Sequence, residues 1–344
     1  MKKRLFSLIC MLAFCLELLP TAALAAQEPV SYIERSWNGS TVTETEKNVS
    51  NYTSITESTT DWSSGWYVAS GNVTINKRVQ LQGNVYLILE DTCVLTIHGG
   101  IHLEGTNSLT IYGQSDGADT MGKLIASITS ENMAVDSAAI GGNTGETGGT
   151  MTVYGGTVEA TITVTNNRLS GSDTSQGSNN RYFEGAVYGA TIGGGGTETG
   201  NGGTGGTMTV YGGAVKASVA ITNDFPEDTD QSQGDGSDTS QGDGSDTSQG
   251  DGSDTSRKGN DGYYGGVVYG AAIGGGGTET DGNGGTGGTA TVYGGAVEAT
   301  VTITNDFGSA SETSQGDSAY GAAIGGGGSE TGNGGDGGTI TIFG

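Results

Sequence analysis

The chain has 344 residues, of which 67 are glycine and only three are proline, and its net charge at pH 7 is −25. Glycine is a poor helix former, and here the glycines are clustered rather than spaced at every third residue. The composition therefore argues against a helical protein and excludes collagen. The excess of acidic residues repels phosphate groups, which excludes nucleic acid as a partner.

Residues 1–25 have the pattern of a secretory signal peptide. The basic start KKR precedes an apolar run from Leu5 to Leu19, and the stretch TAALAA fits the cleavage pattern before Ala26. The run is shorter than the ~20 apolar residues that span a bilayer. We therefore expect a protein that is secreted by a bacterium or held on its surface, with no membrane insertion after cleavage. Cys93 is then the only remaining cysteine, so no intramolecular disulfide can form.

Residues 26–60 are rich in Thr, Ser and Glu, and we expect them to form an extended leader. Residues 61–137 follow with short runs of alternating apolar and polar residues, each closed by Gly, Asn or Asp. The apolar pairs of these expected strands are Val73/Ile75, Val79/Leu81, Val85/Leu87, Leu95/Ile97, Ile101/Leu103 and Leu109/Ile111. The first three pairs recur in the last three at an offset of about 22 residues.

This offset is typical of a β-solenoid, in which each coil of short strands stacks on the next and neighbouring strands lie about 4.8 Å apart. An antiparallel sandwich would give a similar local alternation but not the offset. The predicted fold class is therefore all-β, a parallel β-helix (β-solenoid) with polar low-complexity insertions. Residues 61–137 are its N-terminal coils.

Residues 138–344 contain four copies of a glycine-rich repeat, which we expect to be further coils. The copies start at Ala138, Ala190, Ala271 and Ala322. Polar segments at 166–184, 223–264 and 305–320 separate the copies and should project from one side as flexible inserts. The second of them contains the repeated stretch GDGSDTSQ and is expected to be disordered. The fourth copy stops at TITIFG in mid-repeat, which indicates a longer natural product or a truncated gene.

The chemistry of the sequence favours a protein that is not an enzyme, with no catalytic residues, cofactor or metal site. A glycoside hydrolase needs two positioned carboxylates, but most acidic residues lie in the inserts or in glycine-rich loops. His98 and His102 have the i, i+4 spacing of a metal pair, but that spacing shares a face only on a helix. We therefore expect surface histidines. The stretch around Asp336 resembles glycine-rich calcium-binding repeats only loosely, because their regular spacing is missing.

Aromatic residues give the most informative functional signal. The alternation in TMTVY points Tyr154 and Tyr211 outward, the same holds for Tyr293 in TATVY, and Phe343 holds this position in the last copy. A second series consists of Tyr188, Tyr269 and Tyr320. Sugars stack on aromatic faces, so the first three tyrosines are the candidate carbohydrate-binding residues. The alternative is that the rings only pack on neighbouring coils.

The segments WYVASGNVTI, VYLILEDTCVLTIHGGIHLEG and SLTIYGQS, with the AAIGGG and TVYGG copies, resemble a family of large secreted or surface proteins of gut-type Gram-positive bacteria. That family is described as carbohydrate-binding-domain-containing. The resemblance covers roughly residues 62–344 and implies a parallel β-helix, often with further repeats and a wall anchor downstream. It names no ligand.

Together these observations predict a non-catalytic extracellular or cell-surface repeat protein that binds carbohydrate or is adhesive. Its partner would be an extracellular polysaccharide or glycan. Two alternatives remain open at this point: a polysaccharide lyase or glycoside hydrolase built on a β-helix, and a purely structural surface spacer.

Overall fold

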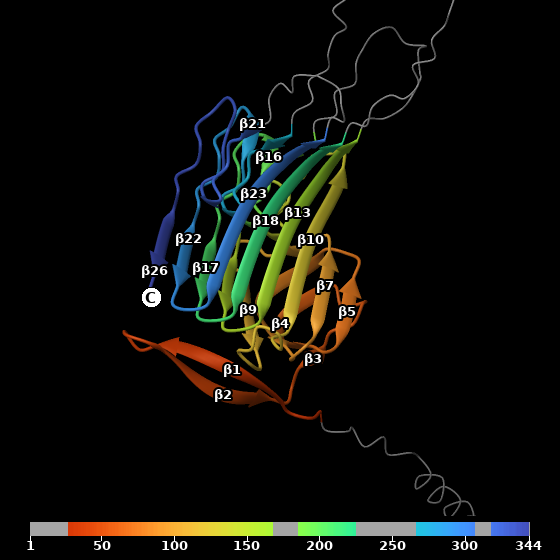
Figure 1. The fold of residues 1–344 in the computed structure, drawn as a ribbon, viewed down its shortest axis with the longest axis vertical. Helices are drawn as coiled ribbons and strands as arrows, with labels where there is room; N and C mark the ends of the chain where they lie inside the picture. Colours follow the sequence, from red (N-terminus) through yellow and green to blue (C-terminus); the bar gives the residue numbers. More distant parts are fainter. Residues whose placement is uncertain (1–26, 168–184, 225–265, 307–317, 344) are drawn as a thin grey trace, which may run out of the picture.

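The computed structural model describes residues 27–167, 185–224, 266–306 and 318–343 (Figure 1). These residues form 26 strands and no helix, so the all-β part of the predicted fold class is confirmed. The predicted signal peptide lies outside the described residues. So do the expected inserts at 166–184, 223–264 and 305–320, apart from their ends.

Two large, mostly parallel sheets make up the protein. The first has 13 strands, of which 11 follow one path: β25 (Ile324–Gly325), β20 (Ile273–Gly274), β15 (Ile192–Gly193), β11 (Ile140–Gly141), β8 (Ile101–His102), β6 (Val79–Leu89), β9 (Ser108–Gly113), β12 (Thr150–Val153), β17 (Thr207–Val210), β22 (Thr289–Val292) and β26 (Thr339–Ile342). Off this path, β4 (Asp61–Ala69) pairs with β6 and with β3 (Thr53–Ser54). The path therefore consists of two branches that both start from β6.

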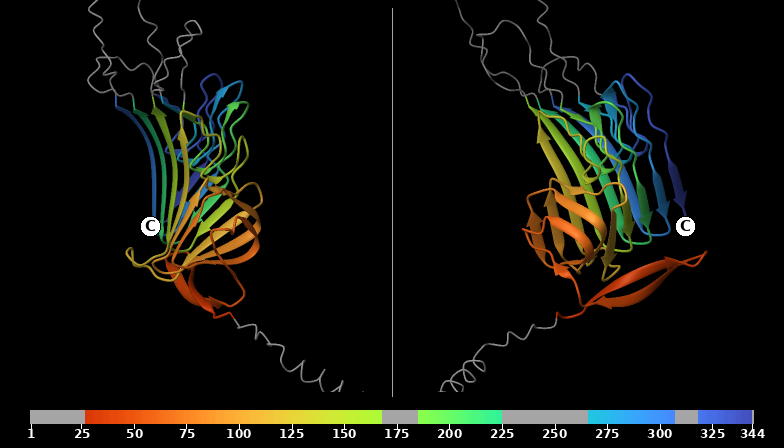
Figure 2. Two further views of the ribbon diagram at one scale, coloured as in Figure 1. Left: turned by 90° about the vertical axis from the view of Figure 1, so that its right-hand side faces the viewer. Right: turned by 180° about the vertical axis from the view of Figure 1, so that it is seen from behind.

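The second large sheet has six strands in the order β23 (Ala296–Asp306), β18 (Ala214–Asp224), β13 (Thr157–Asn167), β10 (Lys123–Glu131), β7 (Val94–His98) and β5 (Asn72–Ile75). Smaller parallel sheets join β14 (Ala186–Val187), β19 (Val267–Val268) and β24 (Ser318–Ala319), and β16 (Thr197–Thr199) with β21 (Thr278–Thr280). The large sheets curve around one hydrophobic core until the enclosure is nearly closed (Figure 2).

The predicted parallel β-helix is wrong. The strands do not form regular coils of three short strands; one sheet path of 11 strands bends into a nearly closed, barrel-like enclosure instead. The prediction fails in part because the expected strands at Val79/Leu81 and Val85/Leu87 are one continuous strand with no turn between them. Gly83 has φ +79 and lies inside the continuous strand β6, opposite a register shift at Ser63 and Gly65 of β4. The glycine is therefore a bulge position within one long strand, and the expected corner is missing.

Equivalent residues of successive repeats are direct neighbours in the sheets. Val73 pairs with Leu95, and Val79 pairs with Ile101, as the offset of the apolar pairs implies. In the later repeats β13, β18 and β23 pair over 11 residues each, in one continuous register. Alternate residues of β13 and β18 point into the core, so each strand buries four apolar side chains and one asparagine. Burying one Val or Ile side chain contributes roughly 1.5–3 kcal/mol.

The N-terminal region forms an antiparallel hairpin of β1 (Val30–Trp37) and β2 (Val42–Val49), where we expected an extended leader. Figure 1 shows the hairpin lying across the end of the sheets opposite the C-terminal ends of β13, β18 and β23. Tyr32 and Val30 are buried there against a second apolar cluster. The ordered part of the chain therefore begins well before Trp62.

Candidate functional site

The predicted tyrosines form a column of stacked rings at the ends of the strands of one branch. The ring centroids are 5.0 Å apart between Tyr154 and Tyr211, 4.8 Å between Tyr211 and Tyr293, and 4.9 Å between Tyr293 and Phe343. Tyr112 extends the column, 5.0 Å from Tyr154. The strands β12, β17, β22 and β26 pair in register, so equivalent side chains of successive repeats lie one strand spacing apart. This spacing is also a favourable distance for stacking two aromatic rings.

The hairpin covers much of this column. Trp37 lies with its ring centroid 5.5 Å from that of Tyr293 and 5.4 Å from that of Phe343. Arg35 is 4% exposed and donates hydrogen bonds to the Tyr154 carbonyl oxygen and to the carboxylates of Glu44 and Asp116. The faces of Tyr154, Tyr211 and Tyr293 are thus occupied by one another, and a sugar could reach only their edges. Carbohydrate contact at these tyrosines stays a prediction.

The second aromatic column combines stacking with carboxylate partners. Tyr188 and Tyr269 are 5.1 Å apart, as are Tyr269 and Tyr320, with interplanar angles of 9° and 4°. The Tyr188 hydroxyl donates to Glu279, and the Tyr269 hydroxyl donates to Glu330 Oε2 at 3.0 Å. Burial and these carboxylates raise the pKa of both tyrosines. Each carboxylate lies far along the chain from its tyrosine, 91 residues away for Glu279 and 61 residues away for Glu330, a partnership that the separate motifs did not predict.

The two histidines have separate environments. His98 is exposed, and its Nδ1 lies 3.1 Å from Ser127 Oγ. His102 is largely buried, with 14% of its side chain exposed, and its Nε2 lies 2.8 Å from Glu146 Oε2 and 3.9 Å from Glu104 Oε2. The expectation of a surface residue therefore fits His98 but not His102. Sequence analysis missed Glu104 and Glu146 because their closeness to His102 depends on pairing between distant segments.

The electrostatics around this group are set by burial and hydrogen bonds. Burial raises the pKa of the Glu146 carboxyl group. Hydrogen bonds from the Asn143 amide and from His102 lower it, as do the charges of His102 and Arg78. The net effect is a pKa below the usual value for glutamate. Burial lowers the pKa of Arg78 to about 10. The Arg78 guanidinium donates to the carbonyl oxygens of Gly99, Ala138 and Gly141. The guanidinium therefore stays charged at neutral pH and links its own strand to the turn at Gly99 and to residues 138–141.

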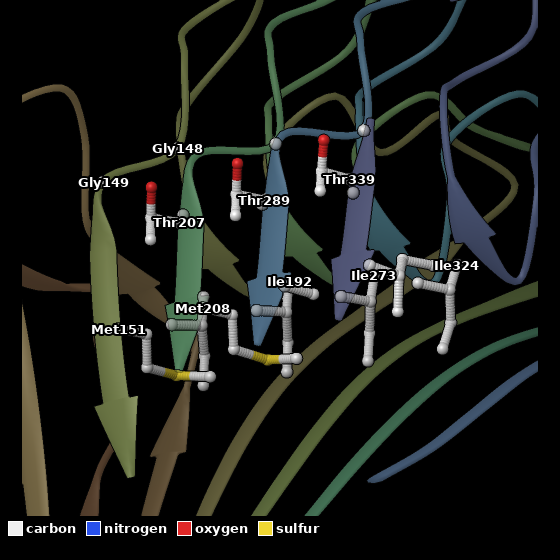
Figure 3. Close-up of a pocket in the computed structure, with 18 of the residues that line it drawn as sticks. Gly148, Gly149, Met151, Ile192, Thr207, Met208, Ile273, Thr289, Ile324 and Thr339 are labelled. Atoms are coloured by element: carbon white, nitrogen blue, oxygen red, sulfur yellow. The ribbon is translucent and has the colours of Figure 1, made fainter. Parts of the chain in front are cut away.

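A narrow slot runs between the two branches of the large sheet (Figure 3). Met151, Met208, Ala290 and Ile340 are register partners along one wall, and Ala290 is smaller than its neighbours. The opposite wall is a row of isoleucines, Ile192, Ile273 and Ile324. Threonines line the slot as well, namely Thr207, Thr289 and Thr339. The lining carries no ionisable side chain. The slot is therefore a packing feature with no catalytic group.

The stretch around Asp336 shows no sign of a calcium site among the described residues. Asp336 is exposed, and its backbone carbonyl accepts a hydrogen bond from the Gly287 amide at 2.8 Å. Within the described part of the chain, one group of three His, Cys, Asp or Glu residues is close enough to hold a metal ion. It consists of His102, Glu104 and Glu146.

No family model, no curated protein and no solved structure matches the chain. In the described ranges, no helix has the length and apolarity needed to cross a bilayer.

Proposed function

We propose that the protein is a non-catalytic extracellular or cell-surface repeat protein whose stacked sheets serve as a scaffold for adhesive, carbohydrate-contacting segments. The observation that carries this proposal is the common exit point of the polar segments. The strands that precede them end side by side, with Asn167 paired to Asp224 and Asp224 paired to Asp306. The strands that follow also pair in register, through Ala186, Val267 and Ser318.

The exit point is held by buried polar contacts. Asn166 Nδ2 donates to Asn223 Oδ1 at 2.7 Å, and the Gly185 amide donates to Asn166 Oδ1 at 3.1 Å. Asn166 and Asn223 are each 1% exposed. A buried side-chain amide is costly unless it is hydrogen-bonded, so these contacts fix where one polar segment begins and ends. A scaffold that presents equivalent segments side by side gains avidity from weak individual contacts.

A segment exchange tests this proposal. Residues 225–265 would be replaced by the sequence of 307–317, which joins equivalent strands and so spans an equivalent gap. Three proteins would be probed on a glycan array and on purified bacterial cell walls. They are the wild type, the exchanged variant, and a variant with Tyr154, Tyr211 and Tyr293 changed to alanine. We expect binding by the wild type that the segment exchange weakens. Absence of binding by the wild type would replace this proposal with a purely structural spacer.

The rival class, a polysaccharide lyase or glycoside hydrolase, has one specific location in the described structure. Glu104 and Glu146 lie together beside His102, and a glycosidase needs two positioned carboxylates. Incubation with pectins, glucans and host glycans should release neither reducing ends nor unsaturated products. Turnover that disappears in both Glu104→Gln and Glu146→Gln would establish the enzyme instead.

A further inference from the structure

The cluster of His102, Glu104 and Glu146 is built by strand pairing between distant parts of the chain. Beyond β8, residues 103–105 run antiparallel to residues 147–149, with a bridge between Glu104 and Gly148. The Gly149 amide donates to the Leu103 carbonyl at 2.9 Å, and the Gly105 amide donates to the Thr147 carbonyl at 3.2 Å. This short ladder places the carboxylates of both segments beside the imidazole.

A tight turn fixes Glu146 in this position. Its amide donates to the Asn143 carbonyl at 3.0 Å, while the Asn143 amide donates to Glu146 Oε2 at 2.9 Å. A Cβ atom at Gly142 would lie 2.3 Å from the Glu146 carbonyl oxygen, so the turn requires glycine there. The Glu146 carboxylate is therefore positioned by backbone geometry rather than left free on the surface.

The orientation of the imidazole is fixed from its other side. His102 Nδ1 lies 2.7 Å from Gln80 Oε1, an acceptor, so Nδ1 carries a hydrogen. Nε2 donates its own hydrogen to Glu146, and a metal ion that binds Nε2 would displace that proton. Gln80 is the register partner of His102 on β6. Nε2 is thereby directed at the two carboxylates. A histidine that binds a metal commonly donates its second ring N–H to such an acceptor, which sets both tautomer and ring orientation.

The distances suit a small divalent cation. The three ligand atoms, one from each side chain, all lie within 4.8 Å of one another, with His102 Nε2 at 2.8 Å from Glu146 Oε2. Ligand atoms about 2.0–2.2 Å from a tetrahedral zinc ion are roughly 3.3–3.5 Å apart, so small side-chain rotations are sufficient. Arg78 adds one positive charge nearby, but the two carboxylates outnumber it.

The cluster belongs to one layer of the fold. Gly141 pairs with His102 in the next strand, and Gly193 pairs with Gly141 in the one after, so the later repeats have no side chain at this position. The side chains of Glu104 and Glu146 are 44% and 38% exposed, which gives an ion access from solvent.

We propose that His102 Nε2 and the carboxylates of Glu104 and Glu146 bind one zinc ion, with water at the remaining position. The ion would join β8 to the turn at residues 143–146 and brace the start of the repeat array. Gln80 is a positioning residue that holds the imidazole. This inference concerns a site separate from the segments of the proposed function.

Zinc titration of the full chain, after removal of metals with a chelator, tests the site. We expect isothermal titration calorimetry to give one tight site per chain, lost in His102→Ala. Glu104→Gln and Glu146→Gln, which keep the side-chain shape, should each weaken it. Gln80→Ala should weaken zinc binding about 10- to 100-fold. The visible absorption spectrum of bound cobalt should lose the contribution of a nitrogen ligand in His102→Ala.

The matched control is His98→Ala. This histidine is on β7, the strand that precedes β8 in the chain. It is exposed and contacts Ser127 rather than the cluster, so its removal should leave zinc affinity unchanged. Circular dichroism of each variant would establish that it is folded. Equal zinc uptake by wild type and by the three ligand variants would mean adsorption to an acidic surface and would overturn the site. Loss of binding in His98→Ala would overturn it as well.

Discussion

Stacking between repeats changes the pKa of individual tyrosines in this protein. Tyr188 and Tyr269 are each 3% exposed, and each hydroxyl is hydrogen-bonded to a glutamate of a later repeat. Ionisation would place a tyrosinate next to a carboxylate in a poorly solvated position. Burial is the larger cause of the raised pKa values, and the neighbouring carboxylates add to it.

The first prediction concerns alkaline stability. The pKa of both tyrosines is raised above the ordinary value of 10.0, so above pH 10 the unfolded chain loses protons that the folded chain retains. The contribution of these two tyrosines to stability should therefore be constant below about pH 10 and fall as the pH rises further. Urea unfolding at stepwise higher pH would measure this. Tyr188→Phe with Tyr269→Phe should flatten the decline, and an unchanged decline would contradict the assignment.

A second residue-scale prediction concerns Cys93, which immediately precedes β7 of the six-stranded sheet and is 1% exposed. Burial raises the pKa of its thiol to about 11. The thiolate is the reactive form, so alkylation by iodoacetamide at pH 7.5 should be negligible in the folded protein and complete in denaturant. Intact-mass spectrometry would show the difference. Rapid labelling under native conditions would mean that the core opens there.

At the scale of elements, the hairpin β1–β2 shows what the sequence could not reveal. The stretch VTETEKNV of β2 has little apolar alternation, and its own composition favours an extended leader. The hairpin is stabilised by contacts on an aromatic column far away in the sequence, chiefly through Tyr32 and Trp37. Tertiary contacts of this kind leave no local periodicity to detect.

The third prediction is that the hairpin undocks without unfolding the sheets. Arg35→Met leaves the Tyr154 carbonyl without its donor, which costs about 1–3 kcal/mol of docking free energy. A glutamate-specific protease should then cut at Glu34, Glu44 or Glu46 faster than in wild type. Lys47→Ala is the control, since its ion pair with Glu34 lies at the surface, where solvent screens it, and should contribute little. Equal cleavage of all three proteins would show that Arg35 does not hold the hairpin.

Part of the candidate site could be predicted from residue patterns and part could not. The alternation in TMTVY and TATVY correctly grouped Tyr154, Tyr211 and Tyr293 as equivalent positions, and these are now neighbours in one column. The packing of Trp37 on Tyr293, and the meeting of Glu104 with Glu146, depend on contacts between distant segments. A pattern within one repeat carries no record of such pairings.

For the whole molecule, the period of the apolar pairs correctly indicated parallel pairing but not the overall shape. The offset fixed which strands are neighbours, such as Val85 with Leu109. It did not fix how many corners a repeat makes, because a glycine can be a turn or a bulge. Gly83 is a bulge, and strands of two to 11 residues occur where equal short strands were expected. The curvature of the sheets follows from these irregularities.

The fourth prediction tests how closely the repeats approach one another. A Cβ atom at Gly195 would lie 1.5 Å from the Asn143 carbonyl oxygen, whereas one at Gly337 would meet nothing within 4 Å. Gly195→Ala should therefore destabilise the protein by about 1–3 kcal/mol, as overpacking does. Gly337→Ala should be nearly neutral. Chemical denaturation of both variants provides the comparison, and equal stabilities would mean that the repeats are more loosely stacked.

The aromatic column also makes the protein its own optical probe. Trp66 stacks on Tyr112 at one end, and Trp37 of the hairpin packs on Tyr293 near the other. Tyrosine emission overlaps tryptophan absorption, so light absorbed by the intervening rings migrates along the column and is emitted by the indoles. Detachment of the hairpin removes one of these two acceptors. The ratio of tyrosine to tryptophan fluorescence therefore reports hairpin docking in real time, without any label.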